Sequence, residues 1–587
     1  MDKSLQRQSF FFCCLICSVF VLSPFYSQQS PGGEGLSIPY NNWVWICAIF
    51  VICSGVFQIL LKRVIILPQY WLALAALPIG FIVSGFINES EKPTQWLFRM
   101  SYVIGGYLFI VALYQFELKR RALENILYAL CAAAVLHSLI ALSQVQGWYF
   151  TSYIPHTTNN APISIFQQIN VHASFLTTAF FVALYLGTCP SLKKRHYAYK
   201  LLLLITITCT SAMLLGISSR TTLVAFSISL PLIIIARYTA FKHNKVFSIM
   251  LLSAFIIGIS GGVVLSQGFA KYETKLDTQR AHARTYIYDL SWQTFKQAPY
   301  FGHGLGSFEQ VFQEAKIDYP HSDKIGGQRF SHPHNELLFW MIEGGISSLT
   351  GIFIALLGSA LALLKLGWRR ALSYCALIFP ISFHTQVELP FYLSSALWFL
   401  WLTLLFLIHN HQVKRYKANL SAATTKLILY CSLSLGALLV GFFLHTTIAL
   451  QGLVTFMRNP QVGYSYLQSA NSNLYYQDLA YNIQLTTLLY RDIALGTNEM
   501  TTVYIEWAEQ YIIKHPVTST MKNLALAYVY LGEREKALKT IRRAARMYPV
   551  TTEIIERLAD IEENKTIDQF KQKIQTHVTR SQAQATP

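Results

Sequence analysis

Long apolar stretches are the feature of this sequence that most restricts its fold. They recur along the first 450 residues of a chain that is 53% hydrophobic and only 13% charged. An apolar stretch of about 17 to 25 residues crosses a hydrocarbon core of roughly 30 Å as one helix. We count about thirteen such stretches, at residues 9–26, 43–61, 64–87, 96–116, 125–146, 163–187, 201–218, 222–236, 246–267, 335–364, 372–389, 391–409 and 427–449. The sequence therefore predicts an all-α, polytopic membrane helix bundle over residues 1–450.

The distribution of positive charge predicts how this bundle is oriented. The formal net charge is +18, and clusters of Lys and Arg recur in alternate connections, such as 62–63, 119–121, 193–195 and 414–417. Cation-rich connections face the cytoplasm by the positive-inside rule. This rule places the N-terminus in the cytoplasm. Because the number of spans is odd, the chain after residue 450 is then expected on the external face of the membrane. Because the charge is explained by topology, we expect a lipid bilayer as partner and no nucleic acid.

The chain after residue 450 changes character, because charge returns and amphipathic periodicity replaces continuous apolarity. The segment MKNLALAYVYLGEREKALKTIRRAARMYP has residues at the offsets of a tetratricopeptide repeat (TPR): Leu524, Tyr528, Gly532, Ala537, Ile541, Ala544 and Pro549. We expect residues 451–565 to form a periplasmic, TPR-like helical domain and residues 566–587 to form a flexible tail. Such arrays usually bind protein segments, and the alternative is that these helices only cap the membrane domain.

The longest exported connection within the membrane part, residues 268–334, is a predicted site region. It carries Arg284 and ends at SHPHNE, with His332, His334 and Asn335. The two histidines lack the i, i+4 spacing of a zinc-binding helix, so we expect no metal. A histidine at the external membrane–water interface is a suitable general base, since its ordinary pKa is about 6.5. The alternative is that Ser331 or Asn335 only caps the following helix.

Other charged residues lie at exported corners of the bundle. Arg220 stands in the turn ISSRTTL, Arg99 in WLFRM, and His384 and Glu388 in HTQVELPFY. Ionisable groups at membrane depth are costly, so they mark either a functional site or a structural ion pair. Arginine binds diphosphate through its fixed fork of donors. With no Walker loop or nucleophile motif, these residues favour displacement at a sugar carbon with a lipid diphosphate as leaving group, without a cofactor.

Several motifs together resemble a known family. His334, Asn335 and Gly345 form an H-N-x9-G pattern that, with arginines like those above, resembles the O-antigen ligase and Wzy polymerase superfamily. FQQINVHA, with Gln168 and Asn170, is similar to the pilin-glycosylation ligase segment, whose usual core is Q-P-N. HTQVELPFYLSSALWF resembles the H-x-x-x-E-x-P corner of PglL-type bacterial protein O-oligosaccharyltransferases.

The resemblance implies a multi-pass enzyme of the bacterial inner membrane whose active site and tail are periplasmic. It would transfer a glycan en bloc from undecaprenyl diphosphate to a Ser or Thr hydroxyl of a periplasmic, pilin-like acceptor, without metal or cofactor. By this resemblance the catalytic residues are His334, as general base, with His384 and Glu388. The expected substrate-binding residues are Arg220 and Arg284, which hold the diphosphate, together with His332, Asn335, Arg99, Gln168 and Asn170.

Two alternatives stay open on the sequence. The nearer one is the same chemistry with another acceptor, either ligation onto lipopolysaccharide core or polymerisation of the glycan. The Glu388 corner and the repeat-bearing tail favour a protein acceptor instead. A transporter or flippase is a different class, in which polar groups lie near midplane and the chain often shows paired halves. The polar residues here gather at one face, and no duplication is evident.

Overall fold

The computed structural model describes residues 3–88, 91–157, 160–217, 219–269, 274–412, 415–563, 565 and 569–570. In this part the chain is almost entirely helical, with one two-stranded sheet. The predicted flexible tail, residues 566–587, lies outside the described residues except for 569–570. Six short 3-10 helices connect the longer elements of this part: Ser23–Phe25, Gly35–Ser37, Tyr149–Tyr153, Pro190–Lys194, Pro460–Val462 and Tyr464–Leu467.

The predicted polytopic all-α fold is confirmed. Among the described residues, nine helices are long and apolar enough to cross a membrane, and three shorter apolar stretches accompany them. Each predicted span overlaps one main helix, with ends that differ by several residues in places: α1 (Lys3–Val21), α2 (Pro39–Lys62), α3 (Trp71–Ile87), α4 (Pro93–Gln115), α5 (Arg120–Val145), α6 (Ile169–Gly187), α7 (Tyr197–Ile217), α8 (Arg220–His243), α9 (Lys245–Phe269), α13 (Glu336–Leu364), α14 (Trp368–His384), α16 (Ser395–Asn410) and α17 (Ala422–Arg458).

One predicted boundary differs in a way that matters for the site. The predicted span 372–389 runs beyond α14, which ends at His384. Pro390 begins the short helix α15 (Pro390–Leu393), and Ser394 then caps α16 by accepting a hydrogen bond from Leu397 N at 3.2 Å. Because the residue before a proline avoids helical geometry, the chain turns between α14 and α15. Glu388 therefore lies in a turn and not inside a membrane-spanning helix.

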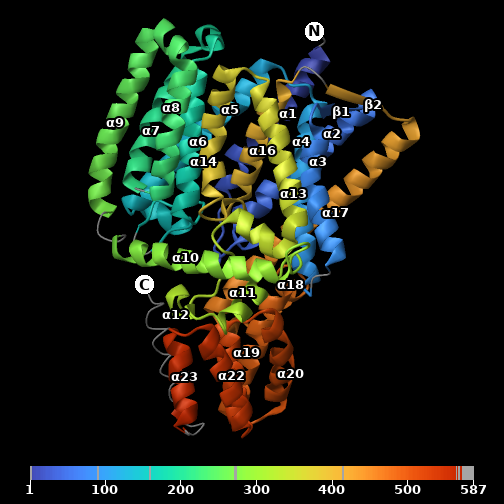
Figure 1. Ribbon diagram of the computed structural model, residues 1–587, viewed down its shortest axis with the longest axis vertical. Helices are drawn as coiled ribbons and strands as arrows, with labels where there is room; N and C mark the ends of the chain where they lie inside the picture. Colours follow the sequence, from blue (N-terminus) through green and yellow to red (C-terminus); the bar gives the residue numbers. More distant parts are fainter. Residues whose placement is uncertain are drawn as a thin grey trace.

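The predicted cytoplasmic connections meet at the end of the bundle farthest from the tail (Figure 1). There β1 (Val64–Pro68) pairs antiparallel with β2 (Arg415–Asn419), so the α2–α3 connection is joined to the start of α17. Glu117 binds Lys62 Nζ at 3.2 Å and Arg415 at 3.8 Å across this junction. The cytoplasmic orientation of this end stays a prediction.

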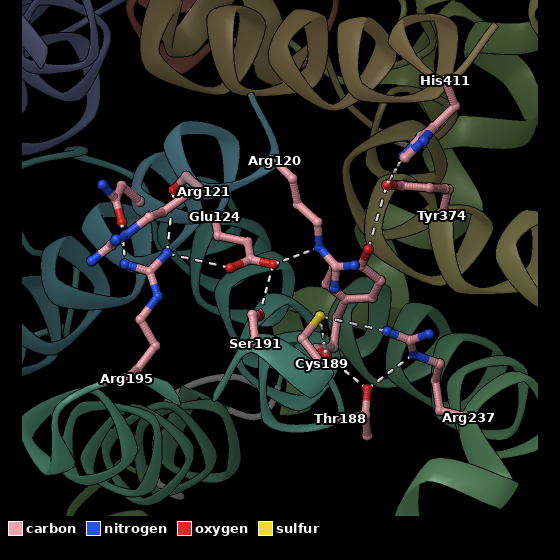
Figure 2. A network of polar contacts seen from close by, with 12 residues as sticks. Arg120, Arg121, Glu124, Thr188, Cys189, Ser191, Arg195, Arg237, Tyr374 and His411 are labelled. Carbon is pink, nitrogen blue, oxygen red and sulfur yellow. Dashed lines mark hydrogen bonds and ion pairs between the residues drawn. The ribbon is translucent and has the colours of Figure 1, made fainter. Parts of the chain in front are cut away.

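Figure 2 shows a second polar network at this cation-rich end. Glu124 of α5 accepts hydrogen bonds from Arg120 Nε at 2.8 Å, from Ser191 Oγ at 2.8 Å and from Arg195 at 3.3 Å. Nearby, Arg237 of α8 donates to Thr188 Oγ1 at 2.9 Å. The Glu124 contacts tie the start of α5 to the connection between α6 and α7, and the Arg237 contact ties the end of α6 to α8, which is a structural role.

Helix α13 is broken, and a connecting loop fills the break. Gly345 has φ 61° and ψ −160°, far from helical values. Four backbone hydrogen bonds join the segments on either side of the break to residues 299–304: His303 N to Ile342 O at 2.8 Å, Gly304 N to Glu343 O at 3.1 Å, Ile346 N to Pro299 O at 2.8 Å and Ser347 N to Tyr300 O at 3.0 Å. Non-helical backbone at membrane depth is tolerated where protein satisfies its polar groups in this way.

In its described residues, the connection 268–334, which is predicted to be exported, carries three helices: α10 (Thr274–Gln297), α11 (Phe308–Lys316) and α12 (Ser322–Ile325). Helix α10 lies across the ends of the membrane helices, between the bundle and the tail (Figure 1). Its buried face includes Ile287, Leu290 and Phe295, which pack in one apolar cluster with Phe339 of α13. Trp292 of the same helix is exposed.

The described part of the tail contains six helices: α18 (Gln468–Asn471), α19 (Gln477–Leu495), α20 (Glu499–Lys514), α21 (Thr518–Tyr530), α22 (Arg534–Met547) and α23 (Thr552–Glu562). From α19 onwards each helix packs against the next. Leu524, Tyr528, Ala537 and Ile541 are buried between them, and Gly532, with φ 80°, forms the turn between α21 and α22. This packing is compatible with the TPR-like assignment, which stays a prediction.

The tail docks on the connection 268–334 through side-chain contacts. Arg543 pairs with Glu314 of α11, and Arg546 pairs with Asp318 at 2.8 Å. Thr551 Oγ1 donates to the backbone oxygen of Gly327 at 2.9 Å. The tail therefore contacts the segment that leads into His334.

Candidate functional site

Four of the predicted site residues converge on a fifth, Glu388. Its carboxylate accepts hydrogen bonds from Asn170 Nδ2 at 3.1 Å and from Gln168 Nε2 at 3.3 Å. His384 Nε2 lies 3.0 Å from Oε2, and an Arg284 guanidinium nitrogen lies 3.9 Å from Oε1. These five residues, which we call the Glu388 cluster, come from α6, α10, α14 and the turn after α14.

The Glu388 carboxylate is held in its ionised form. Burial would raise the pKa of this carboxyl, but the hydrogen bond and charge of His384, the hydrogen bond from Asn170 and the charge of nearby His334 lower it to about 2. A carboxylate with so low a pKa is a poor proton acceptor near neutral pH. Glu388 is therefore suited to orient its partners and not to carry a proton.

Local structure explains why these side chains meet. Gln168 is the N-cap residue of α6 and Asn170 lies in its first turn, so both amides project from the helix N-terminus. A helix N-terminus favours negative charge, which suits the Glu388 carboxylate. On the other side, Glu388 N donates to His384 O at 3.0 Å, which continues the last turn of α14 and holds the two side chains together. Ser174 Oγ lies 2.8 Å from His384 Nδ1 and fixes the ring.

Asn170 also connects the cluster to Arg220. Its Oδ1 accepts a hydrogen bond from Ser219 Oγ at 2.9 Å. Ser219 is the N-cap residue of α8, and Arg220 is the first residue of that helix. The chain Glu388, Asn170, Ser219 thus sets where α8 begins. Arg220 is exposed at this helix N-terminus, which itself attracts anions.

His334 stands beside the cluster in an uncommon backbone conformation. Its φ is 57°, a left-handed value that few residues other than glycine adopt and that often marks functional sites. Its backbone N donates to His332 Nδ1 at 3.2 Å, and its backbone oxygen accepts from Tyr288 Oη of α10 at 3.2 Å. The rings of His332 and His334 lie edge to face, with centroids 4.7 Å apart.

Asn335 holds two segments of the site together. Its Oδ1 accepts from Leu338 N at 3.0 Å, which caps α13, and its Nδ2 donates to Gln386 O at 3.0 Å. The adjacent Glu336 N donates to Thr385 O at 2.8 Å. The side chain thus has the capping role that the sequence left open as an alternative to substrate binding, and it fixes the His334 segment against the turn that carries Glu388.

Arg99 does not join the Glu388 cluster. Its Nε lies 3.2 Å from Glu343 Oε2, and its guanidinium stacks over Tyr392 at 4.0 Å and Phe339 at 4.7 Å. Glu343 Oε1 also accepts from Phe308 N at 3.3 Å. Arg99 therefore forms a buried ion pair that braces α4, α13 and α11, which is the structural alternative considered for it.

Several site residues were missed on the sequence. Ser174, Ser219 and Tyr288 each contact a predicted site residue, and Glu343 neutralises Arg99. Two of them carried a signal. Ser219 is a favoured N-cap residue directly before Arg220, and Glu343 is a carboxylate inside an apolar stretch, which demands a partner.

Taken together, the geometry offers two arginines, a histidine and a fixed carboxylate at one end of the bundle, on the side of the tail. Arginine forks stabilise the oxygens of a departing diphosphate, and a neutral histidine accepts a hydroxyl proton. The described residues contain no group of three or more His, Cys, Asp or Glu that could hold a metal. The roles of the individual residues stay predictions.

Comparison with known families gives two matches. Residues 204–353 match the family described as O-antigen ligase, which covers α7 to the middle of α13 and so includes Arg220, Arg284 and His334. Residues 372–559 match the family described as virulence factor membrane-bound polymerase, C-terminal, which covers Glu388 and most of the tail. No curated protein matches the chain. Together with the polytopic fold, the two matches support the O-antigen ligase and Wzy polymerase superfamily and a membrane glycosyltransferase function of the ligase or polymerase type.

Proposed function

We propose that this protein is an oligosaccharyltransferase that moves a glycan en bloc from undecaprenyl diphosphate to a Ser or Thr hydroxyl of a periplasmic, pilin-like protein. One observation carries the proposal: Gln168, Asn170, Arg284 and His384 surround the Glu388 carboxylate, and His334 lies beside it. Residues from distant parts of the chain meet here at the bundle end that faces the tail. The sequence motifs that resemble those of the ligase family include these residues.

The reaction is a single inverting displacement. The acceptor oxygen forms a bond to the anomeric carbon of the glycan while the bond from that carbon to the diphosphate oxygen breaks. His334 accepts the hydroxyl proton, and general-base catalysis of this kind contributes about 10²- to 10⁴-fold in rate. Arg220 and Arg284 bind the diphosphate and stabilise the charge that develops on it.

Glu388 and His384 act as positioning residues in this scheme. With a pKa of about 2 the Glu388 carboxylate stays ionised at physiological pH, so it accepts hydrogen bonds throughout the reaction. It orients Asn170 and, through Ser219, the start of the helix that carries Arg220. In this proposal Glu388 and His384 are positioning residues, whereas the expectation from the sequence places both among the catalytic residues.

The second candidate is ligation or polymerisation onto a lipid-linked sugar. The polymerase-described match favours it, because that match runs from residue 372 to 559 and includes most of the tail. A tail of this kind is therefore not specific to enzymes with protein acceptors. The PglL-like corner around Glu388 favours the protein acceptor, and the products of the reaction distinguish the two.

The test expresses the protein with a lipid-linked glycan pathway and candidate pilins in a bacterium that lacks its own ligases. Intact-mass measurement of each pilin is expected to show one added glycan. The His334→Ala variant is expected to abolish that increment, whereas His321→Ala, an exposed histidine of the same connection, is expected to retain it. Glycan on lipopolysaccharide or a lengthened lipid-linked glycan, with unmodified pilins, would establish the second candidate instead.

A further inference from the structure

A large cavity lies apart from the Glu388 cluster. It measures about 910 Å³ and lies between α2, α4, α17 and the start of the tail, so we call it the α4–α17 cavity. Its volume is near the upper end of the range of about 300 to 1,000 Å³ found for small-molecule sites. Of the described residues, neither His334 nor any member of the Glu388 cluster lines it. The donor site of the proposed reaction does not account for this cavity.

The part of the cavity inside the membrane bundle is elongated and mostly apolar, and the paired side chains of Arg99 and Glu343 also line it. Its walls include Ile49 and Ile52 of α2 and Leu435, Leu439 and Phe443 of α17. The lining of α17 extends from Ser432 to Phe443, which corresponds to about 16 Å along a helix. That length matches one leaflet, or about half of a hydrocarbon core of roughly 30 Å. We call this part of the cavity the apolar limb. An acyl chain of the leaflet on the tail's side would fit it.

The part of the cavity next to the tail is polar and carries both signs of charge. Lys92 and Arg329 line it together with Glu34, Glu309 and Asp478. Arg329 pairs with Glu309, and Ser331 Oγ donates to Glu34. Burial lowers the pKa of Lys92, and the charges of nearby Glu309 and Glu343 act in the opposite direction. A chamber with cations and carboxylates matches a head group that carries both a phosphate and an ammonium.

The occupant has to match both parts of the cavity, the apolar part inside the bundle and the charged part next to the tail. A soluble sugar or free phosphate would leave the apolar limb open to water. An amphipathic lipid uses both parts at once.

We propose that the α4–α17 cavity binds one phospholipid with a zwitterionic phosphate–ammonium head from the leaflet on the tail's side. The site is separate from the proposed transferase reaction and does not depend on it. Arg329 and Ser331 connect the chamber to the segment that leads into His334, three residues beyond Ser331. The bound lipid therefore braces that segment against the tail.

The test uses the full-length protein, purified in a mild detergent and measured by native mass spectrometry, with extraction and identification of the retained lipid. One zwitterionic phospholipid per protein is the expected result. Leu435→Trp fills the apolar limb and is expected to lower retention at least about tenfold. Leu433→Trp makes the same change on the opposite side of α17, outside the cavity lining, and is expected to retain the lipid.

A second variant guards against misfolding of the first. Ser101→Trp narrows the cavity from the α4 side and is expected to lower retention to a similar extent. After removal of lipid, vesicles of zwitterionic phospholipid are expected to restore the bound species, and vesicles of anionic phospholipid are not. Retention of no lipid, of a polyprenyl phosphate or of an anionic lipid would overturn the proposal, as would equal retention by the two leucine variants.

Discussion

Replacing Glu388 with glutamine keeps the shape of the side chain and removes the charge on which the cluster depends. Relative to its ordinary value of 4.5, the pKa of Glu388 is lowered to about 2. A difference of that size corresponds to about 3 kcal/mol in favour of the folded state when the group is ionised. Because the pKa is depressed, this contribution is fully present above about pH 4.5 and is lost as the pH falls towards 2.

The expected result is a difference between two stability curves. Near pH 7, Glu388→Gln is expected to be less stable than the unmodified protein by about 3 kcal/mol, and the difference is expected to shrink towards zero near pH 2. With about 2.1 cal/mol/K of unfolding entropy per residue over 587 residues, the apparent melting temperature drops by about 2 °C or more. The assay is thermal unfolding in detergent, followed by intrinsic fluorescence between pH 2 and 7.

An exposed carboxylate provides the matched control. Glu506→Gln, in α20 of the tail, is expected to change stability by less than about 0.5 kcal/mol across the same pH range. Equal stability of Glu388→Gln and the unmodified protein at pH 7 would refute the reasoning. A difference that stays constant down to pH 2 would refute it too, because it would arise from shape and not from charge.

Three further perturbations test other parts of the structure. Ser219→Ala removes the side-chain cap of α8 and its hydrogen bond to Asn170 of α6, so we expect the free energy of unfolding to fall by about 0.5 to 2 kcal/mol and the KM for the lipid-linked glycan to rise. Ser227→Ala in the same helix is the control and is expected to change neither quantity. Equal KM values for the two variants would contradict the positioning role. Gly345→Ala places a Cβ atom 2.5 Å from the backbone nitrogen of Gly302, at a residue whose φ of 61° already disfavours a side chain. The amount of folded protein in membranes is therefore expected to fall sharply. A normal yield of folded protein would contradict the tight contact. Glu343→Ala leaves Arg99 buried without its carboxylate, so the free energy of unfolding is expected to fall by about 3 to 5 kcal/mol. The double variant Glu343→Leu with Arg99→Met is expected to recover most of the melting temperature. A double variant that recovers none of it would contradict the ion-pair account.

The positions of the membrane helices could be predicted from the sequence because a span needs only length and apolarity, which are local properties. The end of α14 was harder, since the apolar stretch continues past His384 and the chain turns only because Pro390 follows. Helices α11 and α12 were not predicted in the connection 268–334. Because these helices are short, their own sequences do not stabilise them, and packing against neighbours does: both pack against α10, and α11 also packs against α22 of the tail.

The site could be predicted in its residue types but not in its contacts. His334, His384 and Glu388 could be selected from the sequence because ionisable groups at the ends of membrane spans are energetically unfavourable unless they have a partner or a function. The central position of Glu388 was not evident, because its partner Gln168 lies 220 residues away in the chain. Arg99 carried the same signal as Arg220, yet it pairs with Glu343. Sequence spacing does not reveal which arginine has a carboxylate on a neighbouring helix.

Glycan transfer by purified protein tests the central claim most directly. In lipid nanodiscs, with isolated undecaprenyl-diphosphate glycan and a purified acceptor, single-turnover transfer is followed by the intact mass of the acceptor. His334→Ala is expected to transfer at least about 100-fold more slowly than the unmodified protein, with an unchanged melting temperature. Transfer by His334→Ala at a rate within a few-fold of the unmodified protein would contradict the claim that the histidine beside the Glu388 cluster accepts the proton.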